Sequence, residues 1–247
     1  MSKELRPDEQ LISQAIEAGL SSQVEAAENL NVKVHTDLLK AVQGEAKSVA
    51  IDGKGVVIQP DVRVEQMELR TDRVAINPLS VLLGQIKLKE PLNAAARMVM
   101  TTDDLNHALN SEFVLDKMKP MALNVEGEEV LLEIQPPLAI DLRMAGKMRF
   151  HGTMLVHYPT EKKSTRFSAL FSPRQGDRPA LLEAFECQPD QGLPLPLTVA
   201  LLQKGQELMR SPYFALEGMI LHIQDVTIVD ETLILEGEAL LAEIPSM

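Results

Sequence analysis

The chain has 247 residues and a formal net charge of −12; 45% of its residues are hydrophobic, yet only 3% are aromatic, none is Trp and 12 are Met. The acidic excess argues against nucleic-acid binding, which depends on Lys and Arg to neutralise phosphates, and against broad adhesion to anionic lipid surfaces. A single cysteine excludes an internal disulfide framework, the N-terminus lacks the apolar core of a signal peptide, and no eighteen apolar residues run together to span a bilayer. We therefore expect a cytoplasmic protein that meets a membrane only peripherally.

The first part of the chain is expected to form a helix followed by strands. Apolar residues recur at helical spacing over residues 7–30, and the acidic residues lie largely off that stripe. Strands are expected at 32–34 and as a hairpin over 49–58. That hairpin should turn through Asp52 and Gly53, because Asp-Gly between apolar runs is a strong turn signal.

A second helix is expected after the apolar run at 94–100. Thr102 is suited to cap its first turn, and Asp103 and Asp104 would there favour the positive end of the helix dipole. The helix should reach about Met118. The two aspartates are thus explained by helix geometry rather than as a catalytic pair.

The second half of the chain is expected to consist mainly of strands. Apolar residues at period two predict hairpins over 121–134 and 140–150, a strand pair over 154–171 and a strand at 182–187. A further helix is expected at 197–210, followed by a last hairpin.

One hairpin spacing occurs three times, with apolar residues at relative positions 0, 2, 7 and 9 around a polar break. The first and third copies also share a one-residue slip before them, which is typical of a β-bulge that bends a sheet. The three sets are Met67, Leu69, Val74 and Ile76; Leu123, Val125, Val130 and Leu132; and Val226, Ile228, Leu233 and Leu235. The sequence therefore predicts an α+β fold, in which repeated hairpins build a highly bent antiparallel sheet. We expect a single domain over residues 1–247, with two to three similar helix-and-hairpin units.

The sequence patterns that would mark an enzyme are missing. There is no glycine-rich phosphate loop, no His or Cys pair at metal-ligand spacing and no nucleophile elbow, and the five histidines are scattered. We therefore predict no catalytic residues, no metal and no cofactor. A hydrolase or transferase whose groups converge only in space stays open as a third alternative.

The stretch PLNAAARMVMTTDDLNHALNSEF, residues 91–113, carries a distinctive pattern. Its members are Thr102, Asp104, Leu105, Asn106, Leu109 and Asn110. This stretch resembles the LmeA-like phospholipid-binding family, and residues 201–241 resemble that family's C-terminal half. The resemblance covers roughly residues 8–244 and is closest to cyanobacterial members. It implies a tubular lipid-binding architecture, in which a highly bent antiparallel sheet wraps along a long amphipathic helix beside an apolar groove.

Flexible aliphatic and thioether side chains suit a greasy ligand of no fixed shape, because Met conforms to irregular partners. Together with the resemblance, this predicts a non-enzymatic protein that holds phospholipid or another acyl-chain lipid in an apolar groove, for transfer or sensing at a membrane. The residues expected to line the groove lie on the dry faces of the predicted elements: Ile12, Ile16, Leu20, Met98, Met100, Leu105, Leu109, Met148, Phe150, Met154, Phe167, Phe171, Leu202, Met209 and Phe214. The alternative is an acidic structural or adaptor protein whose sheet is solidly packed and holds no ligand.

Contact with a membrane surface is expected at two short apolar stretches flanked by Pro, 78–83 and 192–202. The candidate residues are Leu79, Val81, Leu82, Leu195 and Leu197. A modest basic cluster near a predicted loop tip is the candidate contact for a lipid headgroup; it consists of Lys162, Lys163 and Arg166. Long unpaired edge strands would favour a homodimer.

Overall fold

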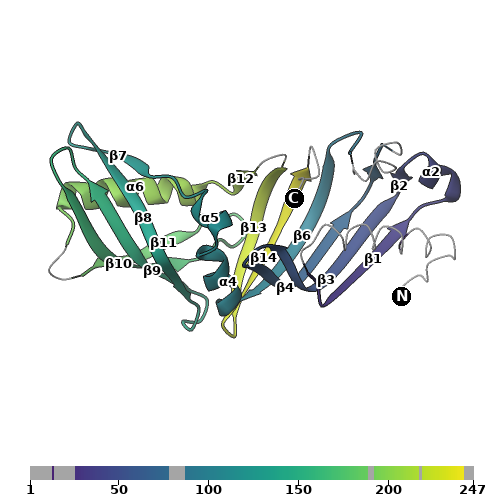
Figure 1. Cartoon of the computed structure of the whole chain (residues 1–247), viewed down its shortest axis with the longest axis horizontal. Helices are drawn as coiled ribbons and strands as arrows, with labels where there is room; N and C mark the ends of the chain where they lie inside the picture. The colour runs from purple at the N-terminus through teal and green to yellow at the C-terminus, as the bar shows by residue number, and fades with distance from the viewer. Residues whose placement is uncertain (1–12, 14–25, 78–86, 189–191, 217–218, 242–247) are drawn as a thin grey trace.

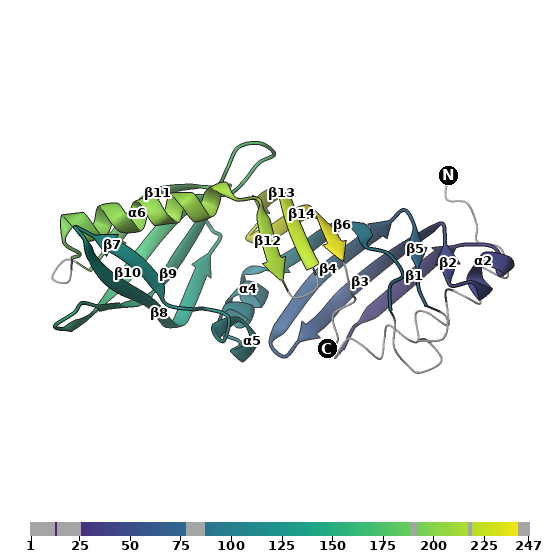
Figure 2. The ribbon, with the colours of Figure 1, turned by 90° about the horizontal axis from the view of Figure 1, so that it is seen from above.

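The computed structural model describes residues 13, 26–77, 87–188, 192–216 and 219–241. These residues form two antiparallel sheets that lie end to end, with two short helices between them (Figure 1). Both sheets are twisted and curled rather than flat, as the view from above shows (Figure 2). The predicted bent antiparallel sheet is therefore confirmed in its coarse form, although it is divided into two.

The larger sheet has seven strands and is assembled from the first and last parts of the chain. Its order is β1-β3-β4-β6-β14-β13-β12, so that β14 pairs with β6, which is far from it in sequence. The strands are β1 (Asn29–His35), β3 (Ser48–Gln59), β4 (Val62–Thr71), β6 (Leu92–Thr101), β12 (Tyr213–Leu216), β13 (Met219–Val229) and β14 (Thr232–Leu241).

The smaller sheet has five strands that follow one another along the chain, in the order β11-β10-β9-β8-β7. Its strands are β7 (Met121–Val125), β8 (Glu128–Asp141), β9 (Met148–His157), β10 (Lys162–Ser172) and β11 (Leu181–Cys187). The helix α6 (Leu195–Arg210) lies along this sheet and then leads back to β12 of the larger sheet (Figures 1 and 2).

Three short helices and a small strand pair complete the described fold. Helices α4 (Thr102–Leu109) and α5 (Glu112–Leu115) lie between the two sheets. The helix α2 (Leu38–Val42) lies at the far end of the larger sheet, next to the strand pair of β2 (Glu45–Ala46) and β5 (Val74–Ala75).

Two of the three predicted hairpin repeats are confirmed. Leu123 pairs with Val130 in the β7-β8 hairpin, and Val226 pairs with Leu235 in the β13-β14 hairpin. The bulge predicted before Val226 is also present, as a register shift between Ile223 and Asp225. It locally increases the twist of the sheet.

The first predicted repeat is wrong, because β4 does not form a hairpin with the segment that follows it. Both edges of β4 are occupied, one by β3 and the other by β6. The chain must therefore leave the sheet after Thr71, and Val74 pairs with Ala46 of β2 instead. The slip predicted within β4 is also absent from its pairing with β3, whose register shift lies between Val57 and Gln59.

The turn predicted at Asp52 and Gly53 is wrong as well. Both residues lie inside β3, which continues without a break between β1 and β4. Strand pairing on both sides supplies every residue of this stretch with neighbours, and it outweighs the local turn preference of Asp-Gly. The turn lies further on, where Asp61 adopts a positive φ of 62°.

The helix predicted from Thr102 to about Met118 is divided in the structure. Thr101, rather than Thr102, caps α4, and its side chain accepts a hydrogen bond from the Asp104 amide. The helix ends at Leu109, since Ser111 caps the separate short helix α5. The predicted helix at 197–210 is confirmed and begins slightly earlier, as α6.

The long helix around which the sheet was expected to wrap was predicted for residues 7–30, most of which lie outside the described residues. Within this range Ser13 and residues 26–30 are described. The predicted helix is wrong at its C-terminal end, because Asn29 and Leu30 belong to β1, where they pair with β3. The hydroxyl of Ser13 accepts a hydrogen bond of 3.0 Å from the amide of Val34 in β1. The single-domain organisation stays a prediction. It is consistent with the larger sheet, whose strands come from both sides of the five-stranded insertion.

Candidate lipid-binding face

One face of the seven-stranded sheet is apolar across six strands. Paired residues of neighbouring strands lie side by side and present their side chains to the same face. Two such rows consist only of aliphatic residues, Met and Gly. The first row is Leu30, Gly53, Met67, Met98, Leu235 and Val226, and the second is Val32, Ile51, Leu69, Ala96, Gly237 and Ile223. We call these twelve residues the apolar face.

Most of the larger side chains of the apolar face are half-buried, whereas Val32, Ala96 and Gly237 are buried. Met67, Leu69 and Met98 all retain partial exposure, while Ala96 is only 6% exposed. Gly237 is required for backbone packing, because a Cβ atom there would lie 2.4 Å from the carbonyl oxygen of His222. The centre of the face therefore consists of the small residues Ala96 and Gly237, and the flexible thioether side chains of Met67 and Met98 lie beside them.

The opposite face of the same sheet is charged. The row between the two apolar rows points to that side and consists of Asn31, Asp52, Glu68, Arg97, Glu236 and Asp225. Arg97 lies between two carboxylates, with its Nε 3.3 Å from Glu236 and its Nη1 3.8 Å from Glu68. Apolar and charged residues thus alternate in register across six strands, which fixes which face can receive a greasy ligand.

A small hydrophobic cluster connects the two sheets. Leu142, Ile228 and Leu233 are buried in it, and partly buried side chains from both sheets and α4 pack around them. The packed neighbours are Leu105, Ile140, Met148, Val226 and Leu235. Two of these, Val226 and Leu235, also belong to the apolar face, so the face continues into the connection.

Helix α4 is fixed to the larger sheet by an ion-pair network. Arg63 of β4 donates hydrogen bonds to Asp104 at 3.0 Å, to Glu65 at 2.8 Å and to Glu28 at 3.0 Å. Asp104 is 6% exposed and also accepts hydrogen bonds from the amide and hydroxyl of Thr101, at 3.1 and 2.7 Å. This network pins the start of α4 to the end of β6.

The pKa of Asp104 is lower than its ordinary value. Burial alone would raise this pKa, but the hydrogen bonds from Thr101 and the Arg63 guanidinium more than compensate. The carboxylates of Glu65, Asp104 and Glu28 in turn raise the pKa of Arg63. Both groups are therefore held charged, and the network is a structural support.

The inner face of the five-stranded sheet is closely packed against α6. Eight buried residues form its core: Leu123, Val130, Leu132, Met154, Val156, Phe167, Ala169 and Leu197. Aromatic rings pack against one another beside it: Phe150 and Phe167 are tilted with centroids 5.8 Å apart, and Phe167 and Phe185 are stacked with centroids 5.9 Å apart. This half of the molecule is stabilised by its own side chains.

The structure distributes the residues predicted to line a groove over three places. Met98 lies on the apolar face, and Met100 follows it on the same side of β6, paired with Leu233. Leu105 and Met148 pack in the cluster between the sheets. The core under α6 includes Phe150, Met154, Phe167 and Phe171.

The other predicted groove residues are less informative. Leu109 of α4, and Leu202 and Met209 of α6, are half-buried. Ile12, Ile16 and Leu20 lie outside the described residues, as does the side chain of Phe214.

The candidate membrane contacts differ in their exposure to solvent. Leu197 has no exposed surface and belongs to the core under α6, so it is not available to a membrane in this structure. Leu195, one half-turn earlier, is 75% exposed. Leu79, Val81 and Leu82 lie outside the described residues.

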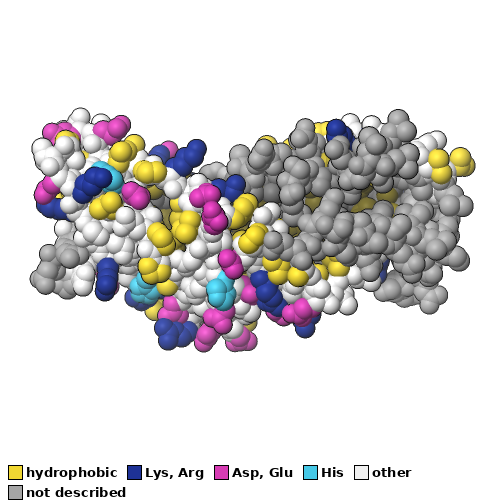
Figure 3. Space-filling model, viewed as in Figure 1, with side chains coloured by type: hydrophobic (Ala, Val, Ile, Leu, Met, Phe, Trp, Pro, Cys, Tyr) yellow, Lys and Arg dark blue, Asp and Glu magenta, His cyan; other side chains and the backbone are white. Residues whose placement is uncertain are grey.

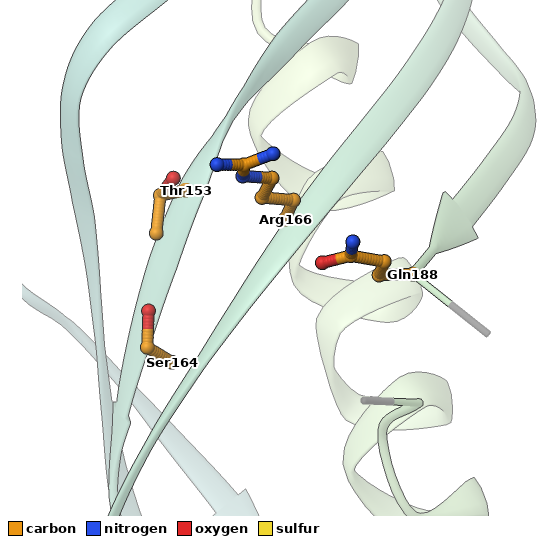
Figure 4. A pocket seen from close by; sticks show the side chains of 4 residues that line it. All are labelled: Thr153, Ser164, Arg166 and Gln188. Atoms are coloured by element: carbon orange, nitrogen blue, oxygen red, sulfur yellow. The ribbon is translucent and has the colours of Figure 1, made fainter. Parts of the chain in front are cut away.

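The three candidate headgroup residues do not converge. Lys162 and Arg166 lie on the outer side of β10, whereas Lys163 alternates to the other side and pairs with Glu161 at 2.8 Å. Arg166 lines an open pocket of about 400 Å³ with Thr153 of β9, Ser164 of β10 and Gln188, which follows β11; α6 lies behind these strands (Figure 4). Among the described residues Arg166 has no ion-pair partner.

Sequence reasoning did not select Met67, Leu69, Leu235 or Ile223 as ligand contacts. The first three were identified only as members of the hairpin repeats. Those repeats were the sequence signal that could have placed them on an apolar sheet face. What the sequence could not supply is the pairing of β6 with β14, which places Met98 beside Leu235 on one face.

The described residues were also searched for metal sites and for membrane-spanning helices. Within them, no group of three His, Cys, Asp or Glu side chains could hold a metal ion. No helix in the described part of the chain is long and apolar enough to cross a membrane.

Among the described residues, the curled antiparallel sheet has one broad apolar face and one charged face. The chain belongs to the LmeA-like phospholipid-binding family, whose family model matches residues 5–238. The resemblance that residues 91–113 and 201–241 carry is thereby confirmed. No curated protein and no solved structure matches the chain.

Proposed function

We propose that the protein is a non-enzymatic lipid binder that holds the acyl chains of a phospholipid against the apolar face of its seven-stranded sheet. The observation that supports this most strongly is the continuity of the two apolar rows over six paired strands. Membership of a phospholipid-binding family points to the same class of ligand.

The dimensions of the face suit an acyl chain. Six strands spaced about 4.8 Å apart span roughly 24 Å. An acyl chain in a bilayer occupies half of a hydrocarbon core about 30 Å thick, or about 15 Å. A chain lying across the strands would therefore contact Met67, Met98 and Leu235 in succession.

The energetics favour exchange with a membrane. Moving an acyl chain out of water is worth about 0.8 kcal/mol per methylene, so a chain of about sixteen carbons represents on the order of 12 kcal/mol. Transfer between a bilayer and an equally apolar protein surface involves almost none of this difference. Such a protein can therefore take up and release lipid at a membrane, for transfer or for sensing.

The adaptor alternative finds local support in the five-stranded sheet, whose inner face is filled by its own side chains. The half-buried Met67, Leu69 and Met98 favour lipid binding for the other half. We therefore place the ligand on the seven-stranded sheet and assign a supporting role to Met154 and Phe167.

The proposal is tested by purifying the full chain, denaturing it and analysing solvent extracts by mass spectrometry. We expect co-purified phospholipid, and uptake of a fluorescent phospholipid by protein from which lipid has been removed. Protein without bound lipid that also fails to take up the labelled lipid would contradict the proposal.

A further inference from the structure

The short helix α2 presents two aliphatic side chains to solvent at one end of the molecule. Leu39 is 78% exposed and Val42 is 79% exposed, more than any other large hydrophobic side chain in the described residues. They are three residues apart and so lie on the same side of the helix. Figure 3 shows hydrophobic side chains at the end of the molecule where Figure 1 places α2.

Helix α2 is held in this position by specific contacts. The side chain of Asp37 accepts a hydrogen bond of 3.0 Å from the amide of Lys40, in the manner of an N-cap. The hydroxyl of Thr36 donates to the carbonyl of Glu45 at 2.7 Å, and Gly44 ends the helix region with a φ of 76°. The exposure of Leu39 and Val42 is thus a consequence of an anchored helix.

Basic and acidic side chains are nearly balanced around this helix, although the protein as a whole is strongly acidic. A pocket of about 300 Å³ beside α2 is lined by Lys40, Glu45, Ala46, Lys47, Asp72 and Arg73. Lys89 reaches the same region, where its Nζ donates to the carbonyl of Gln43 at 2.8 Å. In the segments that form this end, five basic residues face four acidic ones: Lys40, Lys47, Arg73, Lys87 and Lys89 against Asp37, Glu45, Asp72 and Glu90. Lys47 also lies 3.9 Å from Asp37, and Arg73 lies 3.5 Å from Glu90. Both ion pairs are exposed and therefore weak, so Lys47 and Arg73 remain accessible to other anions. The end is close to neutral in a chain of net charge −12.

Backbone hydrogen bonds join residues 75–77 to residues 87–89 at this end of the sheet. The amide of Asn77 donates to the carbonyl of Lys87 at 2.8 Å, and the amide of Lys89 donates to Ala75 of β5.

We propose that this end of the molecule docks on a lipid bilayer, with Leu39 and Val42 entering the interfacial region while Lys40, Lys47 and Arg73 meet lipid phosphates. The inference rests on the proposed function, for which it supplies the route by which lipid reaches the apolar face. Val34 and Val49 pair on the apolar side of β1 and β3 near this end, since β1 ends at His35 just before α2.

A bilayer explains the composition of this end better than a protein partner. Stable protein interfaces bury about 800 Å² on each side, which two exposed aliphatic side chains do not provide. Interfacial membrane contacts combine a few inserted aliphatic groups with electrostatic attraction of Lys and Arg to anionic lipids, each basic residue contributing weakly. Apolar and basic side chains on one small surface match that combination.

The test measures cosedimentation of the full chain with vesicles of phosphatidylcholine, with and without phosphatidylglycerol, beside uptake of a fluorescent phospholipid in solution. The variant Leu39→Ser/Val42→Ser is compared with Leu181→Ser, which replaces a 53% exposed leucine on the five-stranded sheet, and with Leu195→Ser on α6. We expect the double variant to bind phosphatidylglycerol vesicles about tenfold more weakly, a change of about 1.4 kcal/mol. Its uptake of lipid in solution, and both single variants, should remain as in the wild type.

The remaining outcomes separate this inference from the proposed function. Wild-type protein that takes up lipid but does not sediment with either vesicle would overturn the inference, as would a loss caused by Leu195→Ser and not by the double variant. A change in oligomeric state of the double variant would show that a second copy occupies this surface, and would also overturn it. Vesicle binding that depends on α2, without any lipid uptake, would support the docking surface and contradict the proposed function.

Discussion

Asn106 of α4 and Ile140 of β8 are joined by two hydrogen bonds through one side-chain amide. The Asn106 Oδ1 accepts from the amide of Ile140 at 2.7 Å, and its Nδ2 donates to the carbonyl of Ile140 at 3.0 Å. Asn110 repeats this arrangement with Leu138, at 2.8 Å in both directions. Residues four apart on a helix are about 6 Å apart along its axis, close to the roughly 6.7 Å between alternate strand residues. The two amides therefore continue the hydrogen-bonding pattern of β8 beyond the end of β7.

We predict that Asn106→Ala destabilises the protein by about 1–3 kcal/mol, because it leaves the amide and carbonyl of Ile140 without partners in a partly buried position. Asn110→Ala should act similarly through Leu138. The measurement is the free energy of unfolding in denaturant. Asn93→Ala, at an exposed position of β6, is the matched control and should change stability by less than about 0.5 kcal/mol. Equal effects in all three variants would contradict this role of the amides.

The protein should lose stability in acid through Asp104. Since the folded-state pKa of Asp104 lies below its ordinary value, the ionised carboxylate stabilises the fold above the unfolded pKa of about 4. That contribution disappears as the pH falls through the lowered folded pKa. Asp104→Asn should therefore be less stable at pH 7 and show a flatter dependence on pH below about 4. The exposed Asp103→Asn is the control, and an unchanged acid profile in Asp104→Asn would refute the assignment.

Two glycines should respond oppositely to the same substitution. Gly237→Ala would place a Cβ against the backbone carbonyl of His222, which cannot move aside easily, and should cost about 2 kcal/mol or more. Gly205 lies within α6 and has no atom near the position of an added Cβ, so Gly205→Ala should stabilise by about 0.5–1 kcal/mol. Thermal unfolding of both variants checks this, and a stabilised Gly237→Ala would contradict the close approach of Gly237 to the backbone of His222.

Substitutions in the two sheets should separate stability from ligand binding. Met154 is 1% exposed in the core under α6, so Met154→Ala should lower the free energy of unfolding by about 2–5 kcal/mol and leave lipid uptake by the folded protein unchanged. Met98→Gln introduces a single amide on the apolar face and should weaken lipid uptake roughly fivefold or more, since an unpaired buried amide costs about 1–3 kcal/mol. Uptake that depends on Met154 and not on Met98 would place the lipid in the other sheet.

Local patterns predicted much of the fold, because hairpins are local. The alternation around Leu123 and around Val226 is enough to identify two strands and the break between them, and both hairpins are present. The same pattern at Met67 failed, since whether a strand pairs with its successor depends on what already occupies its edges. The pairing of β4 with β6 leaves no edge for Val74.

The motif at residues 102–110 shows a similar limit. Its spacing identified a family and the approximate start of a helix. The structure shows that its polar residues hold α4 in place: Asp104 binds Arg63 of β4, and Asn106 and Asn110 bind the backbone of β8. Those partners are distant in sequence. The apolar face likewise depends on a register between β6 and β14 that no local pattern contains.

The most direct test of the account is photo-crosslinking of the full chain loaded with a phospholipid that carries a photoreactive group on its acyl chain, followed by peptide mass spectrometry. The account predicts adducts on β4, β6 and β14 at Met67, Met98 and Leu235, and none on the charged row that includes Glu68 and Arg97. Adducts confined to the five-stranded sheet, or spread equally over both faces of the seven-stranded sheet, would contradict it.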